Sequence, residues 1–230
     1  MHNLCLIPAR GGSKRIPKKN IKDFFGKPML AYPIETALKS GLFSEIMVST
    51  DDNEITEIAL KHGANVPFFR SAKTADDYAT TADVILEVIK KYSESGIHFD
   101  NICCLYACTP LLGTQHLIIA YEKLITEKKH SLFPVVEVEF PVQRALKIID
   151  TNVEFVYSEH ALTRSQDLEH YYHDAGQFYW INVKSFLKTN KIVGDNSGCI
   201  VLNRMDCQDI DVESDWKIAE LKYTLKNRMI

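Results

Sequence analysis

The sequence predicts an α/β protein with a mostly parallel β-sheet and helices on both faces. Strand-like and helix-like segments alternate from the N-terminus, which is the order of β-α-β units with right-handed crossovers. Residues 101–107 (NICCLYA) form a continuous apolar run, which is typical of a strand covered on both faces. The length of 230 residues and the hydrophobic fraction of 46% suit a single domain, residues 1–230, with one inserted segment.

The first part of the chain contains two strand-like runs with a helix between them. Residues 3–8 (NLCLIP) and 45–50 (EIMVST) are the runs, and residues 28–40 predict a helix that is broken or begun at Pro33. In the helix that follows, one inward face is expected, with Asp51 and Glu54 as a capping pair at its start. The residues of that face are Ile55, Ile58, Ala59 and His62.

The middle of the chain repeats the alternation. Residues 65–69 (NVPFF) are expected to make a third strand, before an amphipathic helix. The inward residues of that helix are Ile85, Val88, Ile89 and Tyr92. After the strand at 101–107, a helix over 114–125 and a strand over 131–139 complete the alternating part.

The pattern changes near residue 140. Residues 140–159 alternate polar and apolar side chains around Asp150, which predicts a two-stranded insert with a polar turn. Because a lone hairpin is marginal in water, we expect it to pack on its own sheet or on a second subunit. Residues 176–183, residues 198–202 and a helix from about Val212 to Leu225 return the chain to the main body. One face of that helix holds Ile218, Leu221 and Leu225.

Composition excludes several classes of function. The 27 basic and 30 acidic residues give a net charge of -3, so nucleic acid and anionic membrane are not expected partners. No apolar run approaches the roughly 20 residues that span a bilayer. A soluble cytoplasmic protein is therefore expected. The six cysteines form no CxxC pair and are expected to be reduced, and His170, His173 and Asp174 are a weak zinc signature.

A cationic loop follows the first strand. Residues 7–20 read IPARGGSKRIPKKN, and five cations but no acid lie between Arg10 and Asn20. A loop at the carboxyl end of a parallel strand lies where open α/β sheets bind ligands. Gly11 and Gly12 allow close backbone approach to a ligand or positive φ, and successive N–H groups in such a turn bind anions. The loop therefore predicts a site for phosphate groups, such as a triphosphate of charge about -4.

The spacing of the glycines excludes the two familiar phosphate-binding loops. The loop contains neither GxxxxGK[ST] nor GxGxxG, so it is neither a Walker loop nor a dinucleotide fingerprint. This argues against an NAD-dependent oxidoreductase, which the order of elements alone would allow. The other interpretation is a solvated basic loop, which charge runs usually are.

A pair of carboxylates near the C-terminus is a candidate metal site. In DCQDIDVESDW, residues 206–216, Asp209 and Asp211 point to the same side if the segment is extended. Mg²⁺ binds one or two carboxylates and completes its octahedron with waters and phosphate oxygens. Asp209 and Asp211 are therefore the predicted Mg²⁺ ligands. Asp211 is also placed to cap the final helix, and the two roles are compatible.

These motifs together resemble one enzyme family. IPARGGSKRIPKKN, with VSTDD at residues 48–52, is similar to the signature of the acylneuraminate cytidylyltransferases, or CMP-sialic acid synthetases, and the similarity spans nearly the whole chain. Within the family, LYACTPLL and YYHDAGQFYWI are most similar to the pseudaminic acid cytidylyltransferase branch. The resemblance implies a Rossmann-like, glycosyltransferase-A-like fold. It also implies a homodimer in which the insert, at about residues 140–175, reaches the partner's active site.

The resemblance implies a reaction between CTP and a nonulosonic acid, which is a nine-carbon 2-keto sugar acid. The products are the CMP-sugar acid and pyrophosphate. Arg10, Lys14 and Lys19 match the cations that hold the triphosphate, and with Asp211 they are the expected catalytic residues. The expected nucleotide-binding residues are Ala9, Arg10, Gly11, Gly12, Ser13, Lys14, Lys19, Asn20 and Arg70. Asn20 matches the asparagine beside the ribose, and Arg70 matches an arginine near the cytosine.

The sugar acid requires a cation, short polar donors and flat apolar walls. The expected substrate-binding residues are Tyr106, Arg164, His173, Asp174 and Gln177. The chain departs from the sialic acid branch, which has glutamine at Tyr106 and arginines at Leu112 and His173. Fewer guanidinium groups and more ring surface suit pseudaminic acid, which has fewer hydroxyl groups. Arg144, Lys147 and Arg164 are candidates to replace the lost charge.

Other substrates and one other class of protein stay open. The same reaction on N-acetylneuraminic, legionaminic or 3-deoxy-manno-octulosonic acid needs the same loop and carboxylates. A non-catalytic module that binds the nucleotide would keep the loop, although the presence of both Asp209 and Asp211 argues against it.

Overall fold

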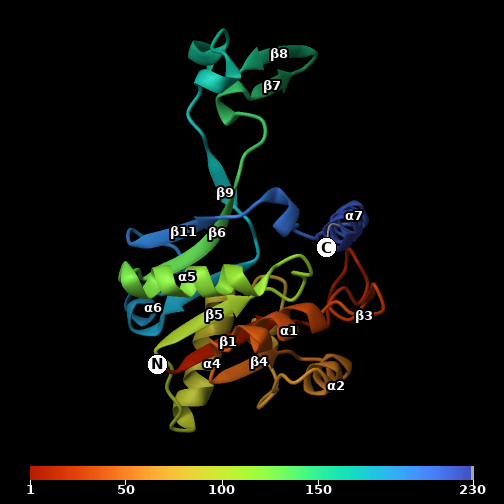
Figure 1. Cartoon of the computed structure of the whole chain (residues 1–230), viewed down its shortest axis with the longest axis vertical. Coiled ribbons are helices and arrows are strands. Elements are labelled where there is room, and N and C mark those ends of the chain that lie inside the picture. The colour runs from red at the N-terminus through yellow and green to blue at the C-terminus, as the bar shows by residue number, and fades with distance from the viewer. Residues whose placement is uncertain (229–230) are drawn as a thin grey trace.

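The computed structural model describes residues 1–228, and a seven-stranded sheet lies at its centre (Figure 1). The strand order is β11-β6-β10-β5-β1-β4, and β9 pairs with the last three residues of β6. The strands are β1 (Asn3–Pro8), β4 (Glu45–Ser49), β5 (Asn101–Leu105), β6 (Ser131–Glu137), β9 (Tyr172–Asp174), β10 (Phe178–Asn182) and β11 (Ser197–Val201).

The sheet is mostly parallel, as predicted. β1 pairs in parallel with β4 and with β5, so that Cys5 lies between Ile46 and Cys103, and β11 pairs in parallel with β6. β10 runs antiparallel to both β5 and β6, which therefore point the same way. The carboxyl ends of β1, β4 and β5 lie at one edge, and the residues that follow them share this edge.

Helices cover both faces of the sheet. On one face α1 (Ala31–Ser40), α2 (Asn53–Lys61) and α5 (Thr114–Thr126) pack on Cys5 and Ile7 of β1, and Figure 1 shows α1 and α5 in front of the sheet. On the other face α4 (Thr81–Glu94) and α6 (Val183–Thr189) pack on Leu4 and Leu6. Because the side chains of a strand alternate, each apolar strand supplies both cores. The prediction of two covered faces is confirmed.

The prediction of a third strand over residues 65–69 is wrong. Of residues 65–69, Asn65 alone forms a bridge, with Met47 of β4. Asn65 N–H donates to Ile46 O, and Val48 N–H donates to Asn65 O. Pro67 has no N–H to continue such a ladder, which accounts for its end after one bridge.

The closing helix, α7 (Glu213–Arg228), presents a different face from the expected one. The side chains of Ile218, Leu221 and Leu225 are exposed, and Trp216 and Ala219 are the buried ones. These two residues belong to a third apolar cluster, the α7 cluster, which also contains Ile16, Phe24, Met29, Tyr32 and Ile210. Phe24 lies in the small hairpin of β2 (Asp23–Phe24) and β3 (Lys27–Pro28).

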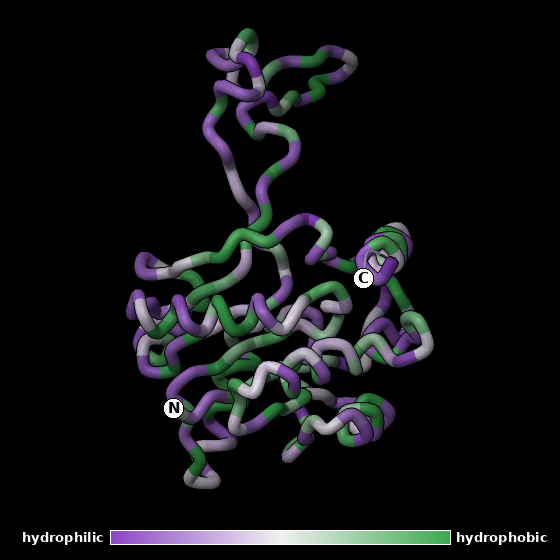
Figure 2. Tube along the Cα trace, in the orientation of Figure 1, coloured by the Kyte–Doolittle hydropathy of each residue, from purple (hydrophilic) through white to green (hydrophobic). Residues whose placement is uncertain are grey.

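The segment between β6 and β9 forms an arm that projects from the sheet (Figure 1). It contains the predicted hairpin, here β7 (Leu146–Ile149) and β8 (Asn152–Phe155), and short 3₁₀ turns at Val142–Arg144, Ser158–His160 and Ser165–Asp167. Figure 2 shows hydrophobic residues along this arm as well as along the sheet. Every residue of β7 and β8 is exposed, including Ile148 at 76% and Val153 at 59%.

Among residues 1–228, none of the helices combines the length and the hydropathy needed to cross a membrane.

Candidate active site

The cationic loop, residues 9–20, joins β1 to the β2–β3 hairpin and is held at both ends. Ala9 N–H donates to Ser49 O at the end of β4, and the Asn20 side chain donates to Arg10 O over 3.0 Å. In the middle of the loop, Ile16 is buried in the α7 cluster. The loop is therefore tied to the sheet at its start, to itself at its end, and to α7 between them.

Gly11 serves the packing of the loop rather than an unusual backbone angle. Neither Gly11 nor Gly12 has positive φ, so that part of the expectation is wrong. Gly11 N–H donates to the Asp51 carboxylate over 2.9 Å, and a Cβ at Gly11 would lie 2.8 Å from Asp52 Oδ2. A Cβ at Gly12 would meet no atom within 4 Å. The close approach at Gly11 is thus to the end of β4.

Asp51 and Asp52 have separate roles at that strand end. Asp52, not the predicted pair of Asp51 and Glu54, caps α2, because its carboxylate accepts from Ile55 N–H over 3.1 Å. Asp51 holds Gly11 instead. The spacing rule for a capping pair placed the cap one residue too early, since Asp52 itself has the extended backbone that a cap requires.

A cavity of about 510 Å³ opens beside the cationic loop. The predicted nucleotide-binding residues that line it are Arg10, Ser13, Lys14, Lys19, Asn20 and Arg70. Ala9 is buried and lies behind this wall. Tyr106, predicted for the sugar acid, and Asp211 also line this cavity. The opposite wall is formed by side chains between Thr74 and Val84, and the acids among those that line the cavity are Asp76 and Asp77.

Arg70 is the most firmly fixed cation of the cavity. Its side chain donates to Ser49 Oγ over 3.1 Å and to Ser49 O over 2.7 Å, and only 8% of the residue is exposed. Burial lowers the pKa of Arg70, and the Asp51 charge opposes that shift. Because one edge of the guanidinium is already fixed, the side chain loses little conformational freedom when its other donors bind a ligand.

Asp209 and Asp211 flank Ile210, which anchors them in the α7 cluster. Asp211 accepts from Arg15 over 2.9 Å and lies 3.7 Å from Lys19 Nζ. Asp211 is not the helix cap, because the Asp215 carboxylate accepts from the N–H groups of Asp211 and Val212. The Asp211 carboxylate is therefore turned toward the cationic loop.

The donor set fits Mg²⁺. Burial raises the pKa of Asp209, and the negative charge of Asp211 raises it further, so a divalent cation between them would relieve an existing repulsion. Residues 1–228 contain no group of three or more His, Cys, Asp or Glu side chains that could hold a metal. Two carboxylates suffice for Mg²⁺ when substrate phosphates and waters complete its ligands. Within residues 1–228, His170, His173 and Asp174 do not come together as a group that could hold zinc.

A second cavity, of about 360 Å³, is lined in part by Asp209. His173 and Asp174, both predicted for the sugar acid, line it together with Arg204 and Lys222. Asp174 is oriented by Tyr179, whose hydroxyl donates to its carboxylate. Burial raises the pKa of Tyr179, and the bond to Asp174 adds to the shift, so the phenol stays protonated as the donor.

Two other residues predicted for the sugar acid lie away from both cavities. Gln177 is 1% exposed, and its amide donates to Ala175 O and Gly176 O beneath Asp209. Arg164 lies in the arm and pairs with Asp167 over 2.7 Å. Within one chain, therefore, Arg164 lines neither cavity. Lys147, also in the arm, pairs with Glu154.

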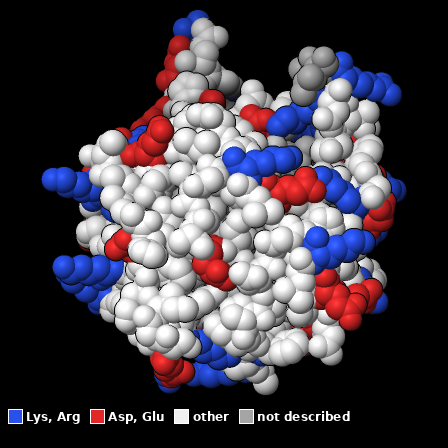
Figure 3. Space-filling model, turned by 60° about the horizontal axis from the view of Figure 1, so that its bottom comes forward, with Lys and Arg blue, Asp and Glu red and all other residues white. Residues whose placement is uncertain are grey.

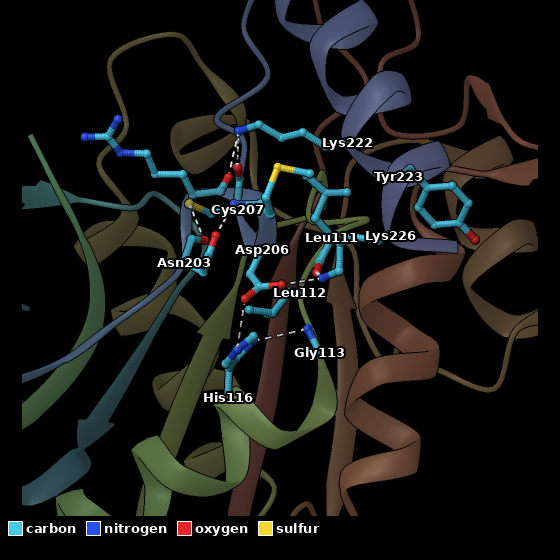
Figure 4. Close-up of polar contacts among 12 residues, drawn as sticks. Leu111, Leu112, Gly113, His116, Asn203, Asp206, Cys207, Lys222, Tyr223 and Lys226 are labelled. Atoms are coloured by element: carbon cyan, nitrogen blue, oxygen red, sulfur yellow. Dashed lines mark hydrogen bonds and ion pairs between the residues drawn. The ribbon is translucent and has the colours of Figure 1, made fainter. Parts of the chain in front are cut away.

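Residues that sequence reasoning missed hold the Asp209–Asp211 segment in place. Lys222 of α7 donates to Arg204 O, Cys207 O and the Gln208 side chain, each within 2.9 Å. Figure 4 shows Asp206 between His116 and Lys226, and Lys226 also donates to Leu111 O over 2.8 Å. Burial lowers the pKa of His116, and Gly113 N–H donates to its Nδ1. Lysines in a helix are usually solvated in a sequence reading, so Lys222 and Lys226, which are partly buried here, gave no sequence signal for this role.

Charge is otherwise dispersed. Figure 3 shows Lys and Arg side chains interspersed with Asp and Glu on the face it presents, with wide uncharged areas. This face therefore carries no extended cationic surface, in keeping with the net charge of -3.

Comparison with known proteins gives the same fold and one family. Residues 4–193 match the cytidylyltransferase family. The pseudaminic acid cytidylyltransferase of Campylobacter jejuni is 46% identical over 228 residues, which are 99% of this chain and 98% of that protein. The CMP-N,N'-diacetyllegionaminic acid synthase of Legionella pneumophila is 30% identical over 234 residues, covering 96% of this chain and 95% of that protein.

A solved structure of CMP:2-keto-3-deoxy-manno-octonic acid synthetase, complexed with CTP, shares the fold. Its TM-score is 0.71 at 15% sequence identity, and the match covers 98% of this chain and 100% of that one. The predicted Rossmann-like α/β fold is thus confirmed. With its residues 4–193 matched and a relative 46% identical over nearly its whole length, this chain belongs to the cytidylyltransferase family of nucleotidyltransferases.

Proposed function

We propose that this enzyme joins CTP to pseudaminic acid, giving the CMP-sugar acid and pyrophosphate, with Mg²⁺ as its cofactor. The observation that supports this most directly is the arrangement of the two cavities. Asp211 lines the first cavity, with the cationic loop, and Asp209 lines the second, with His173 and Asp174. A nucleotide in the first and a sugar acid in the second would meet at this carboxylate pair.

The lining of the first cavity offers binding groups for each part of CTP. Arg10, Lys14 and Lys19 bind the triphosphate, since each adds a charged donor to the same wall. Asn20 and the buried Arg70 line the same cavity and bind the nucleoside, at the ribose and near the cytosine respectively. Ser13 also lines this cavity and, with Gly12 beside it, completes the loop around the phosphates, whereas the N–H groups of Ala9 and Gly11 are bonded to Ser49 O and to Asp51.

The chemistry is a displacement at the α-phosphorus. The anomeric hydroxyl oxygen of the sugar acid forms the new P–O bond and its proton passes to solvent water, while the bond to the pyrophosphate oxygen breaks and its electron pair leaves with pyrophosphate. Arg10, Lys14 and Lys19 neutralise the charge that grows on the leaving and equatorial oxygens. Mg²⁺ held by Asp209 and Asp211 would polarise the phosphate oxygens and lower the pKa of a bound hydroxyl.

The identity of the sugar acid rests on relatives and on polarity. The C. jejuni relative, at 46% identity, is named for pseudaminic acid, and the L. pneumophila relative, at 30%, for a legionaminic acid. Tyr106, Leu112 and His173 stand where the sialic acid branch has more polar or cationic side chains. Of these three residues, His173 lines the second cavity, Tyr106 lines the first, and Leu112 is buried in the core. The polarity argument therefore depends mainly on His173, and a deoxy, diacylamino sugar needs fewer polar partners there.

Release of pyrophosphate, measured with CTP, Mg²⁺ and one sugar acid at a time, tests the assignment. The panel is pseudaminic, legionaminic, N-acetylneuraminic and 3-deoxy-manno-octulosonic acid. We expect the highest kcat/KM with pseudaminic acid, by at least about tenfold. Turnover with N-acetylneuraminic acid alone would overturn the assignment. Tight CTP binding without turnover of any sugar acid would favour the non-catalytic nucleotide-binding module.

We also propose that the chain is a single nucleotidyltransferase domain, residues 1–230, that works as a cytoplasmic homodimer, where CTP is made. The segment at about residues 140–175 is then its dimerisation element. The exposed apolar side chains of the arm support this, because a two-stranded hairpin without a covered face is marginal in water. Arg164, which lines neither cavity of its own chain, would then act in the partner's active site.

A further inference from the structure

Two cations of the loop converge on one carboxylate from the opposite wall of the nucleotide cavity. Arg10 NH1 lies 2.8 Å from Asp77 Oδ1, and Lys14 Nζ lies 2.5 Å from Asp77 Oδ2. The same Arg10 nitrogen donates to Asp76 O over 2.7 Å. Each oxygen of Asp77 therefore takes one of the cations that the triphosphate requires. Mutual attraction lowers the pKa of Asp77, with the Lys14 hydrogen bond as the largest cause.

The turn that presents Asp77 is a built structure and not a loose loop. The Asp76 carboxylate accepts from the N–H groups of Tyr78 and Ala79 over 2.9 and 2.7 Å, so it is occupied within the turn. Asp77 is thereby left to face the cations. On one side of the turn, α3 (Ala72–Ala75) is tied to α4 through Glu87, and on the other Thr80 and Asp83 form the capping box of α4.

Asp77 and a bound triphosphate compete for the same donors. Arg10, Lys14 and Asp77 all line one cavity, and the side chains of all three are at least one-third exposed. Exposed ion pairs are weak and are readily exchanged. A triphosphate, with several negative charges against the single charge of Asp77, displaces it from Arg10 and Lys14 and is at the same time repelled by it.

We propose that Asp77 is a stand-in anion for the triphosphate: it keeps Arg10 and Lys14 directed into the cavity before CTP binds, and it limits the affinity for CTP and for the product pyrophosphate. Asp77 is a positioning residue, because it acts through the two cations and not on the reacting atoms. This inference rests on the proposed function in that the first cavity is the triphosphate site. Weaker binding of pyrophosphate lets this product leave sooner, and faster release raises the turnover rate.

The test compares the full-length protein with Asp77→Asn, which keeps the shape and removes the charge. The dissociation constants of CTP and of inorganic pyrophosphate are measured by calorimetry with Mg²⁺ and without sugar acid. We expect both to fall about threefold to tenfold, the range set by two weak exposed pairs. In steady state, both KM for CTP and kcat should fall, because pyrophosphate leaves more slowly, whereas a purely structural role would raise KM.

Glu54→Gln is the matched control. Glu54 pairs with Lys18 of the same loop over 2.5 Å, but Lys18 does not line the cavity, and the substitution changes the net charge by the same amount. We expect unchanged dissociation constants. Equal or weaker binding of both anions by Asp77→Asn would overturn the inference, as would the same gain in Glu54→Gln. Failure of the unmodified protein to bind CTP would instead contradict the proposed function.

Discussion

At the scale of single residues, the missing side chain of Gly11 matters to the site as much as the charged side chains of the loop do. Gly11 has no side chain where a Cβ would lie 2.8 Å from Asp52 Oδ2, and its N–H is fixed by Asp51. The cationic loop therefore packs closely against the capped start of α2 at Gly11. The cations of the loop were predictable because they lie within a few residues of each other. The roles of Asp51 and Asp77 were not, because acids shortly before a helix are usually read as caps.

Gly11→Ala is expected to displace the loop from the end of β4. The added Cβ would push the Asp52 carboxylate away from Ile55 N–H and weaken the cap of α2, at a cost of about 1 kcal/mol in the free energy of unfolding. CTP binding should weaken as well, since Arg10 moves with the loop. Urea unfolding and CTP titration measure the two effects. Gly12→Ala, where a Cβ meets nothing within 4 Å, is the control, and an equal effect there would contradict this account.

Asp211→Ala is expected to reduce kcat about 10²-fold to 10³-fold, the usual effect of removing one group that stabilises transition-state charge. Its side chain is 44% exposed, its short ion pair is with the exposed Arg15, and its pair with Lys19 is long at 3.7 Å, so the free energy of unfolding should change by less than about 1 kcal/mol. Asp215→Ala is the converse control, because Asp215 binds the N–H groups at the start of α7. That variant should lose stability and keep most of its turnover. Near-normal turnover by Asp211→Ala would exclude the metal site.

At the scale of elements, short segments are held by neighbours rather than by their own propensity. α3, of four residues, is too short to be stable alone. Glu87 of α4 holds it by accepting from Ser71 N–H, from the Ser71 and Thr74 hydroxyls, and from Lys91. Burial by itself raises the pKa of Glu87, but these hydrogen bonds outweigh it and bring the pKa to about 2. The contact between the two helices is therefore electrostatic.

The pKa of Glu87 predicts how stability depends on pH. The value falls from 4.5 to about 2 on folding, so this carboxylate stabilises the protein above pH 4.5, and the contribution is lost as the pH falls toward 2. We expect Glu87→Gln to lower the free energy of unfolding by roughly 1–2 kcal/mol at pH 7, and by much less at pH 3. Urea unfolding at both pH values is the measurement. A difference that is equal at the two pH values would show that shape, and not charge, matters at this position.

At the scale of the whole molecule, the fold followed from the sequence more closely than the site did. The strands and helices of the sheet have simple apolar periodicities, and these depend only on local spacing. The second cavity is different, because β9, the end of β6 and residues 204–209 meet there only through the strand order, with β10 inserted between β5 and β6. No local pattern encodes that meeting. Equally, nothing in the alternation of α7 shows that its face with Ile218, Leu221 and Leu225 is exposed.

The arm predicts the oligomeric state. Ile148, at 76% exposure in β7, should lie against the second copy, so Ile148→Asp is expected to convert a dimer to monomers. Sedimentation velocity measures the change. Leu187→Asp, an exposed apolar position on α6 in the body of the protein, is the matched control and should leave the dimer intact. An unmodified protein that sediments as a monomer would rule out the dimer.

The α7 cluster brings together Ile16 of the cationic loop and Ile210 of the carboxylate segment, and Arg15 contacts Asp211 across 196 positions of sequence. During synthesis on the ribosome, the first of these segments emerges long before the second. The sheet strands near the N-terminus can pair early, but the cationic loop lacks its apolar anchor until Ile210 and the residues of α7 have been made. The cationic loop therefore reaches its final conformation later than the strand that precedes it, and only in the presence of a segment about two hundred residues farther along the chain.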